Sequence, residues 1–119
     1  QNKYILIKKT IPVVHIRSPD DLHKVKLQPH LPYIFIDALI GIGLQGDIRE
    51  PLVSAIKFFN DNEGYKVALD VPSGLDADTG SLATTHTNVD LIITLHDLKT
   101  GLVELRDKTI IVDIGLGKK

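Results

Sequence analysis

Two aspartates follow apolar runs of strand length, at the positions where a parallel sheet binds its ligands. Asp37 ends the run Tyr33–Ile36, and Asp70 ends the run Tyr65–Leu69. Ligands of an open parallel sheet bind outside the carboxyl ends of its strands, so an acid there can hold a cation or move a proton. One such acid could equally well cap a turn. Two successive strands that end in this way favour a functional role, whereas for Asp113, close to the last residue, we favour a structural one.

The segment between these two acids is rich in glycine. Gly41–Gly46 reads G-x-G-x-x-G, the spelling of a dinucleotide-binding fingerprint. In that fingerprint the glycines lead straight into a helix, whose N-terminus meets the pyrophosphate, but here Asp47–Pro51 separates them from the helical pattern. A dehydrogenase of this type is therefore excluded by context. The glycines still let a ligand approach backbone N–H groups closely, and an ordinary flexible loop is the alternative interpretation.

The segment after the second strand concentrates oxygen ligands. LDVPSGLDADTG, residues 69–80, holds three carboxylates and two hydroxyls. Such ligands suit a hard cation. Asp76–Gly80 does not make a calcium loop, because the other acids and the bidentate Glu of that motif are missing. We therefore expect Asp76 and Asp78 to hold a turn through their side-chain hydrogen bonds.

Alternating strand-like and helical patterns predict the scaffold that positions these residues. The runs expected to form strands are Pro12–Ile16, Tyr33–Asp37, Tyr65–Asp70, Val89–Leu95 and Thr109–Asp113, and Tyr4–Ile7 fits a helix end or a short strand. A continuous apolar run such as Tyr33–Ile36 is typical of a strand buried on both faces. Strand, helix and strand in this order form βαβ units, which build parallel sheets with right-handed crossovers, so the fold class is α/β.

The sequence predicts the N-termini of two helices. Ser18 is a good N-cap, with Pro19 at the first helical position and acids in the first turn. Pro51 begins the second helix, which should end near Asn60 to Gly64. Its apolar side chains recur at helical spacing and are expected to pack in the core: Leu52, Val53, Ile56 and Phe59.

Composition limits the function classes. The chain has 119 residues, 43% of them apolar, 14 basic against 15 acidic side chains, and no Cys or Met. These numbers suit one soluble domain with its own core, and they exclude disulfide scaffolds, thiolate metal sites and cysteine nucleophiles. No clustered basic run suggests nucleic acid as a partner, and no apolar run approaches a membrane span. Because the chain begins at Gln1 and lacks Met, we expect it to be a fragment of a longer protein.

Other polar residues give weaker signals. The histidines lack the spacing and partner acids of a metal site, and we interpret them as surface or loop residues: His15, His23, His30, His86 and His96. Lys99 has two interpretations of equal weight, contact with a substrate phosphate or solvation of a loop edge.

Several blocks, taken in order along the chain, resemble one family. They are Ile36–Leu44, Glu50-Pro51, Ala68–Gly80 with its D-x-P-S-G-x-D pattern, Asp90–Thr94, Lys99, Gly101-Leu102 and Val112–Leu116. This order is similar to the YjeF N-terminal domain, the NAD(P)H-hydrate (NAD(P)HX) epimerase family. The resemblance runs from about residue 11 to the end of the chain.

The resemblance implies a fold, an activity and a set of sites. The fold is a three-layer Rossmann-like α/β architecture, a mostly parallel sheet with helices on both faces, expected here to be incomplete at its N-terminus. The activity is the interconversion of the R and S forms of hydrated NADH and NADPH during nicotinamide nucleotide repair. Asp37 and Ser73 match potassium ligands, and Asp70 matches the acid that contacts the hydrated ring. The loop residues that match the substrate-binding segment are Gly41, Ile42, Gly43, Leu44, Gln45, Gly46 and Asp47.

The family's chemistry carries further expectations. Epimerisation at a carbon bearing a hydroxyl beside the ring nitrogen requires proton transfer, for which we assign Asp70 as general acid/base. A homodimer, a separate NAD(P)HX dehydratase as functional partner and a cytoplasmic location are implied, or a mitochondrial location if a transit peptide preceded the chain. No nucleic acid or membrane partner is expected.

This sequence also departs from the family pattern. Nothing in it resembles the N-N-G-G-D-G block that binds phosphate and potassium, which should precede Gln1, so we expect little activity from residues 1–119 alone. His96-Asp97-Leu98 replaces the usual residues before Lys99. The alternative function is a non-catalytic nucleotide-binding or dimerisation module, which retention of Asp70 and its loop disfavours.

Overall fold

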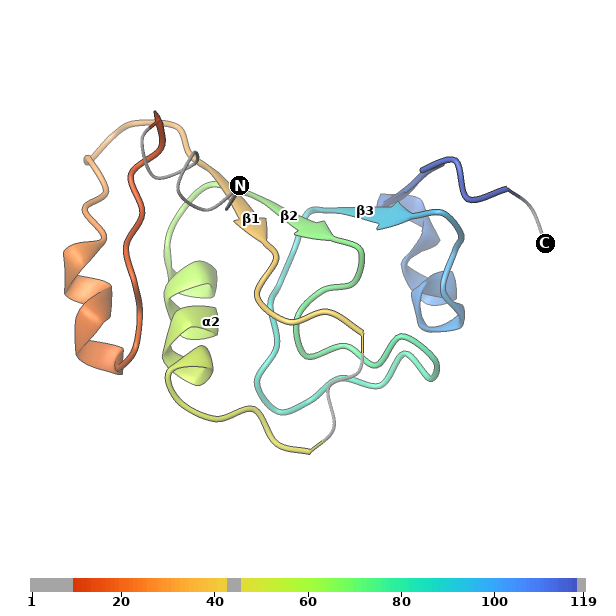
Figure 1. Cartoon of the computed structure of the whole chain (residues 1–119), viewed down its shortest axis with the longest axis horizontal. Coiled ribbons are helices and arrows are strands. Elements are labelled where there is room, and N and C mark those ends of the chain that lie inside the picture. Colours follow the sequence, from red (N-terminus) through yellow and green to blue (C-terminus); the bar gives the residue numbers. More distant parts are fainter. Residues whose placement is uncertain (1–9, 43–45, 118–119) are drawn as a thin grey trace, which may run out of the picture.

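The computed structural model describes residues 10–42 and 46–117 (Figure 1). Its helices and strands are η1 (Pro19–Lys24), β1 (Ile34–Asp37), α2 (Leu52–Asp61), β2 (Tyr65–Leu69), β3 (Leu91–Leu95), η2 (Thr100–Lys108) and β4 (Thr109–Val112), where η marks a 3₁₀ helix. Among these residues, no helix has both the length and the apolar character that crossing a membrane requires.

The strands form one four-stranded parallel sheet in the order β1-β2-β3-β4. Ile36 pairs with Val67, and Val67 pairs with Leu91, so equivalent side chains point to the same face across neighbouring strands. Each connection moves one strand along the sheet in the same direction. Since crossovers are right-handed, such an order puts the connections on one face. The expected α/β Rossmann-like sheet is confirmed.

The core lies between the sheet and the helices on that face. Phe59 of α2 packs with Ala68 and Ile92 of the sheet and with Leu102 of η2, and all four are buried. Phe35 of β1 meets Phe59 edge to face, with ring centroids 6.0 Å apart. Figure 1 shows η1 on the outer side of α2. The expected core role of the α2 stripe is confirmed for Ile56 and Phe59, which are buried, whereas Leu52 and Val53 are only partly buried.

The other face of the sheet is open among the described residues. Ile34 is 70% exposed and Ile36 is 61% exposed in β1, and Ile110 of β4 is 52% exposed. The expectation that Tyr33–Ile36 is buried on both faces is wrong here, because no described element covers this side. The second helical layer of the expected three-layer architecture stays a prediction.

The N-terminal segment differs most from the sequence expectation. Pro12–Ile16 forms no strand. Its β-branched residues suit a pleated surface, but β1 is the edge strand of the described sheet, and no described strand pairs with this segment. Tyr4–Ile7 lies outside the described residues. The helix expected at Ser18 does begin there, as the short 3₁₀ helix η1, and the Asp21 carboxylate accepts hydrogen bonds from the N–H groups of Arg17 and Ser18.

Smaller differences occur at other element ends. Pro51 is the N-cap of α2 rather than its first helical residue, and it follows a cis peptide bond from Glu50. The helix η2 was not expected from the sequence, since its mixed polar and apolar residues have weak helical periodicity. The structural role favoured for Asp113 agrees with the structure, because its carboxylate accepts a hydrogen bond from the N–H of Gly115 at 2.8 Å.

Candidate functional site

The loops that follow the strands meet at the carboxyl edge of the sheet, as the two strand-end acids predict. Asp37 is the last residue of β1, and Asp70 follows the last residue of β2. The register places Asp37 beside Ala68, so the two acids stand at neighbouring strand ends. Strand ends of a parallel sheet share one edge, which brings these acids together with the loops that leave it.

Asp37 is 1% exposed and accepts four hydrogen bonds. Its Oδ1 receives the Ser73 hydroxyl at 2.6 Å and the Leu39 N–H at 3.2 Å. Its Oδ2 receives the Ser73 N–H at 2.8 Å and the Thr87 hydroxyl at 2.5 Å. A buried carboxylate requires this degree of compensation. Asp37 therefore joins the loop after β1 to both ends of the connection between β2 and β3.

Ser73 is the second centre of this network. It is 1% exposed, its hydroxyl accepts the Ile40 N–H at 3.0 Å, and its carbonyl accepts the Thr87 N–H at 2.9 Å. The Ile40 carbonyl lies 3.4 Å from the same hydroxyl. Ser73 thus fixes the start of the glycine segment against the D-x-P-S-G loop, and the structure brings Asp37 and Ser73 together.

Thr87 is the member of the network that sequence reasoning missed. It lies just before β3 and is 4% exposed, although it stands among polar residues in the sequence. Its hydroxyl approaches Asp37 across a sequence separation of 50 residues. No local pattern could have indicated this contact, because only the crossover between β2 and β3 brings the two residues together.

Asp70 occupies a left-handed backbone conformation, with φ of 67°. Its Oδ1 accepts hydrogen bonds from the Lys99 ammonium at 2.5 Å, the Leu95 N–H at 3.1 Å and the Thr94 hydroxyl at 3.3 Å. Partial burial acts to raise the pKa of Asp70, but the bonds from Lys99 and Leu95 and the ammonium charge outweigh it and hold the pKa below its usual value. Asp70 is therefore a carboxylate at neutral pH.

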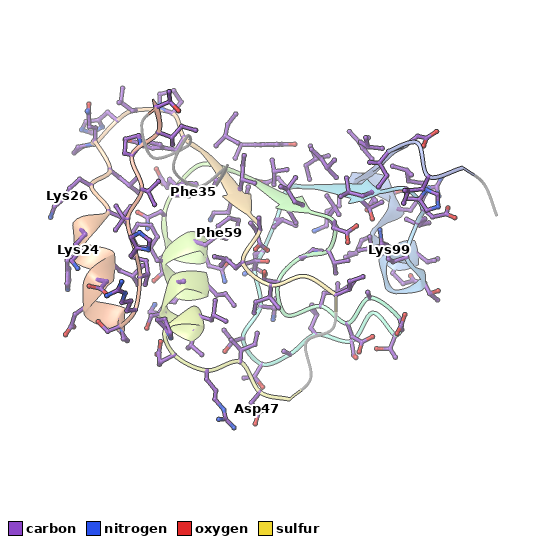
Figure 2. All side chains as sticks on the ribbon, viewed as in Figure 1. Lys24, Lys26, Phe35, Asp47, Phe59 and Lys99 are labelled. Carbon is purple, nitrogen blue, oxygen red and sulfur yellow. The ribbon has the colours of Figure 1, made fainter. Side chains whose placement is uncertain are left out.

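A cavity of about 590 Å³ opens between the glycine segment and the D-x-P-S-G loop. Gly41, Ile42 and Gly46 line it from one side, and Asp76, Asp78 and Lys99 are among the residues that line it from the other. Of the expected substrate-binding residues, Gly43, Leu44 and Gln45 lie outside the described residues. Asp47 is exposed at the rim of the molecule and does not line the cavity (Figure 2).

The turn expected at Asp76 and Asp78 is confirmed for the Asp76 side chain, whereas Asp78 contributes its backbone N–H. The Asp76 Oδ1 accepts the N–H groups of Asp78 at 2.9 Å and Thr79 at 2.8 Å. These two backbone bonds lower the pKa of Asp76. The turn packs on η2, where the Gly101 N–H donates to the Ala77 carbonyl at 2.7 Å. Asp76 therefore adds negative charge to the cavity while holding its wall in shape.

None of the five histidines, which the sequence predicts to be surface or loop residues, is buried: His15, His23, His30, His86 and His96. No cluster of three or more His, Cys, Asp or Glu side chains suited to a metal ion occurs in the described part of the chain. His86 lies at the loop before β3, where its Nδ1 is 2.9 Å from the Ala83 carbonyl. The Asp37 network differs from such a cluster, because it combines a single carboxylate with hydroxyl and backbone groups.

Comparison with known families finds a match over most of the chain. Residues 1–101 match the family described as YjeF-related protein N-terminus. The chain belongs to this family. The matched region includes the strand-end acids, the glycine segment, the D-x-P-S-G loop and Lys99, whereas the block Val112–Leu116 lies beyond it. Membership of this family replaces the dehydrogenase interpretation of the glycine segment. The structure agrees, because the described residues 46–51 form no helix, whereas a dinucleotide-binding fingerprint leads straight into one.

Three curated relatives extend the comparison. The NAD(P)H-hydrate epimerase of Nitrosopumilus maritimus (strain SCM1) is 44% identical over 66% of this chain and 36% of its own length. The NAD(P)H-hydrate epimerase of Cenarchaeum symbiosum (strain A) is 45% identical over 66% of this chain and 37% of its own. The bifunctional NAD(P)H-hydrate repair enzyme Nnr of Archaeoglobus fulgidus is 42% identical over 70% of this chain and 18% of its own. The aligned segment thus spans about a third or less of each relative's length.

Proposed function

We propose that this protein is an NAD(P)H-hydrate epimerase, which interconverts the R and S forms of hydrated NADH and NADPH. The observation that carries the proposal is the Asp70 carboxylate at a strand end, which is bound at 2.5 Å by Lys99, a residue that lines the cavity together with Gly41, Ile42 and Gly46. The names of the relatives give the reaction. The carboxylates Asp76 and Asp78 on the cavity wall disfavour phosphates, so the substrate's phosphates should lie away from them.

Within this proposal, Asp70 takes part in proton transfer. Epimerisation at the hydroxyl-bearing carbon needs C–O cleavage and re-addition, and each step moves a proton. The lowered pKa of Asp70 makes the carboxylate the resting form, so Asp70 suits the base half of the reaction. The substrate-binding residues we propose are Gly41, Ile42, Gly43, Leu44, Gln45, Gly46 and Asp47, together with Asp70.

The experiment uses the protein at its natural length, established first by intact mass. The purified R form of hydrated NADPH is incubated with the protein, and appearance of the S form is followed by chromatography. Asp70→Asn should fold, since Asn also tolerates a left-handed backbone, and should lose about 100-fold or more in turnover. Asp97→Asn, at an exposed loop position, is the matched control. An inactive natural protein would contradict the proposed function, and a normal rate for Asp70→Asn would contradict the role of Asp70.

We further propose that a potassium ion is held by Asp37 and Ser73. The donor set fits, because the Asp37 carboxylate, the Ser73 hydroxyl and the Ile40 carbonyl present only oxygen atoms within one small region. The ion would supply positive charge that orients the substrate. Potassium should raise the melting temperature above the value in choline chloride at equal ionic strength, and Ser73→Ala should remove the difference. Equal melting temperatures for the unmodified protein in both salts would contradict the site.

The remaining parts of the proposal are the functional partner, the oligomeric state and the cellular location. The Archaeoglobus relative is a bifunctional repair enzyme, which supports a dehydratase as functional partner. A homodimer and a cytoplasmic location complete the proposal, and analytical ultracentrifugation of the natural protein tests the former. The alternative function predicted from the sequence, a non-catalytic nucleotide-binding or dimerisation module, would be favoured if the natural protein bound the hydrate without epimerising it.

A further inference from the structure

We propose that Lys99 is a catalytic residue, the acid that donates a proton to the hydroxyl group leaving the hydrated ring. The proposal rests on the proposed function and deepens it, since it assigns the acid half of the proton transfer. It is carried by the position of the Lys99 ammonium between the cavity and the Asp70 carboxylate.

Lys99 is held in place by the elements around it. It is the N-cap residue of η2 and lies just after β3 (Figure 2). Its Nζ donates to Asp70 Oδ1 at 2.5 Å and to the Leu95 carbonyl at 2.7 Å. The Lys99 side chain is 21% exposed and that of Asp70 is 23% exposed. A lysine with two fixed acceptors is far more ordered than one that only solvates a loop edge.

Lys99, and not Asp70, lines the cavity between the glycine segment and the D-x-P-S-G loop. A proton that moves between Asp70 and a molecule in this cavity therefore has the ammonium as its nearest carrier. Among the described residues that line the cavity, Lys99 is the only cationic side chain. The carboxylates of Asp76 and Asp78 lie on the same wall, and His96 and Asp97 precede Lys99 in the sequence.

The two halves of the reaction need different groups. Asp70 is a carboxylate at neutral pH and has no proton to give. An ammonium group is a donor only, with three hydrogens. Two of the Lys99 hydrogens point to Asp70 and Leu95, which leaves the third for a substrate hydroxyl. A general acid must lie within hydrogen-bond reach of its target, and a side chain on the cavity wall meets that condition.

The reaction is then balanced without an external reagent. The Lys99 ammonium protonates the hydroxyl oxygen, the C–O bond breaks with its electron pair on the oxygen, and water leaves. The ring nitrogen's lone pair and the nearby Asp70 carboxylate stabilise the resulting cation. Water adds to the other face of the same carbon, and its extra proton passes to the Lys99 amine, which the Asp70 carboxylate holds at 2.5 Å and stabilises as the ammonium. Both side chains return to their starting states.

The test uses the natural-length protein and the epimer assay described above. Lys99→Ala should lower kcat by about 100-fold or more, and added methylammonium should restore a measurable part of the rate. Lys99→Arg keeps the positive charge beside Asp70 but is a very weak acid, so it should remain close to Lys99→Ala. Lys57→Ala is the matched control, because Lys57 also pairs with an aspartate at 2.5 Å, at an exposed position of α2. Circular dichroism melts check that each variant folds.

The outcomes separate this proposal from the proposed function. An inactive unmodified protein overturns the function and with it the role of Lys99. An active protein whose Lys99→Ala variant keeps its rate overturns the role of Lys99 alone. Full activity of Lys99→Arg would show that charge suffices, which overturns proton donation. A loss in Lys99→Ala that amines of varied basicity rescue, with no effect of those amines on Lys57→Ala, supports proton donation.

Discussion

At the scale of single residues, the Asp37 network is held by side chains from segments distant in sequence. Thr87 contributes one short hydrogen bond to the buried carboxylate. Thr87→Val keeps the shape of the side chain and removes this donor, so it should lower the free energy of unfolding by about 1–2 kcal/mol. Urea denaturation of Thr87→Val and of the exposed control Thr84→Val measures this loss in the free energy of unfolding. Equal midpoints for the two variants would show that the bond contributes nothing to stability.

The Asp70–Lys99 pair makes a prediction about pH. The pKa of Asp70 is lower in the folded state than its usual value near 3.9, so the pair stabilises the fold above that value and its contribution is lost as pH falls through the lowered pKa. Asp70→Asn should therefore cost roughly 1 kcal/mol at pH 7 and less at pH 3. Urea titrations of both proteins at the two pH values measure the difference. A cost that stays constant between them would contradict this linkage.

These residues also show how far the sequence could predict the site. Asp37, Asp70 and Ser73 were found because strand ends and the D-x-P-S-G pattern mark them locally. The link between Asp70 and Lys99 joins residues 29 positions apart, and Thr87 is farther still from Asp37. Such contacts depend on which strands become neighbours, and hydrophobic periodicity carries no information about that.

At the scale of elements, the unit from β1 through α2 to β2 was predicted within a residue or two at each end. The sequence pattern of this unit is distinctive, since apolar runs of strand length flank an amphipathic helix. Pro12–Ile16 also contains β-branched residues but forms no strand, because a strand requires a partner as well as suitable residues. The helix η2 was missed because its packing on the Asp76 turn, rather than its periodicity, determines where it lies.

The contact between η2 and that turn requires glycine at position 101. A Cβ atom on Gly101 would lie 2.8 Å from the Ala77 carbonyl and 2.8 Å from the Gly80 nitrogen, both of them rigid backbone. Gly101→Ala should therefore destabilise the fold by roughly 1–3 kcal/mol. Gly41→Ala is the control, since no atom of the described residues lies within 4 Å of its added Cβ. Thermal melts of both variants decide the matter, and a Gly101→Ala melt as high as that of Gly41→Ala would refute the close approach.

At the scale of the whole molecule, the open face of the sheet is the dominant feature. The radius of gyration is 15.5 Å, above the value of about 13.5 Å expected for a compact domain of this length. Apolar side chains of three strands are exposed together on one side: Ile34, Ile36, Tyr65, Leu69, Ile110 and Val112. Contiguous apolar surface of this kind is uncommon on monomeric proteins. Since the net charge is only −1, charge repulsion gives the chain little protection from self-association.

This open face should bind a fluorescent apolar dye such as ANS. Residues 1–119 should enhance ANS fluorescence, and the combined change Ile34→Lys, Ile36→Lys and Ile110→Lys should remove most of the enhancement. The free energy of unfolding should change by less than about 0.5 kcal/mol per site, because each side chain is already more than half exposed. Leu82→Lys, at 56% exposure on a loop away from this face, should leave the dye signal unchanged. If the triple variant kept the full signal, dye binding would have to occur at another surface, and the open face would not be the apolar surface that the chain presents to solvent.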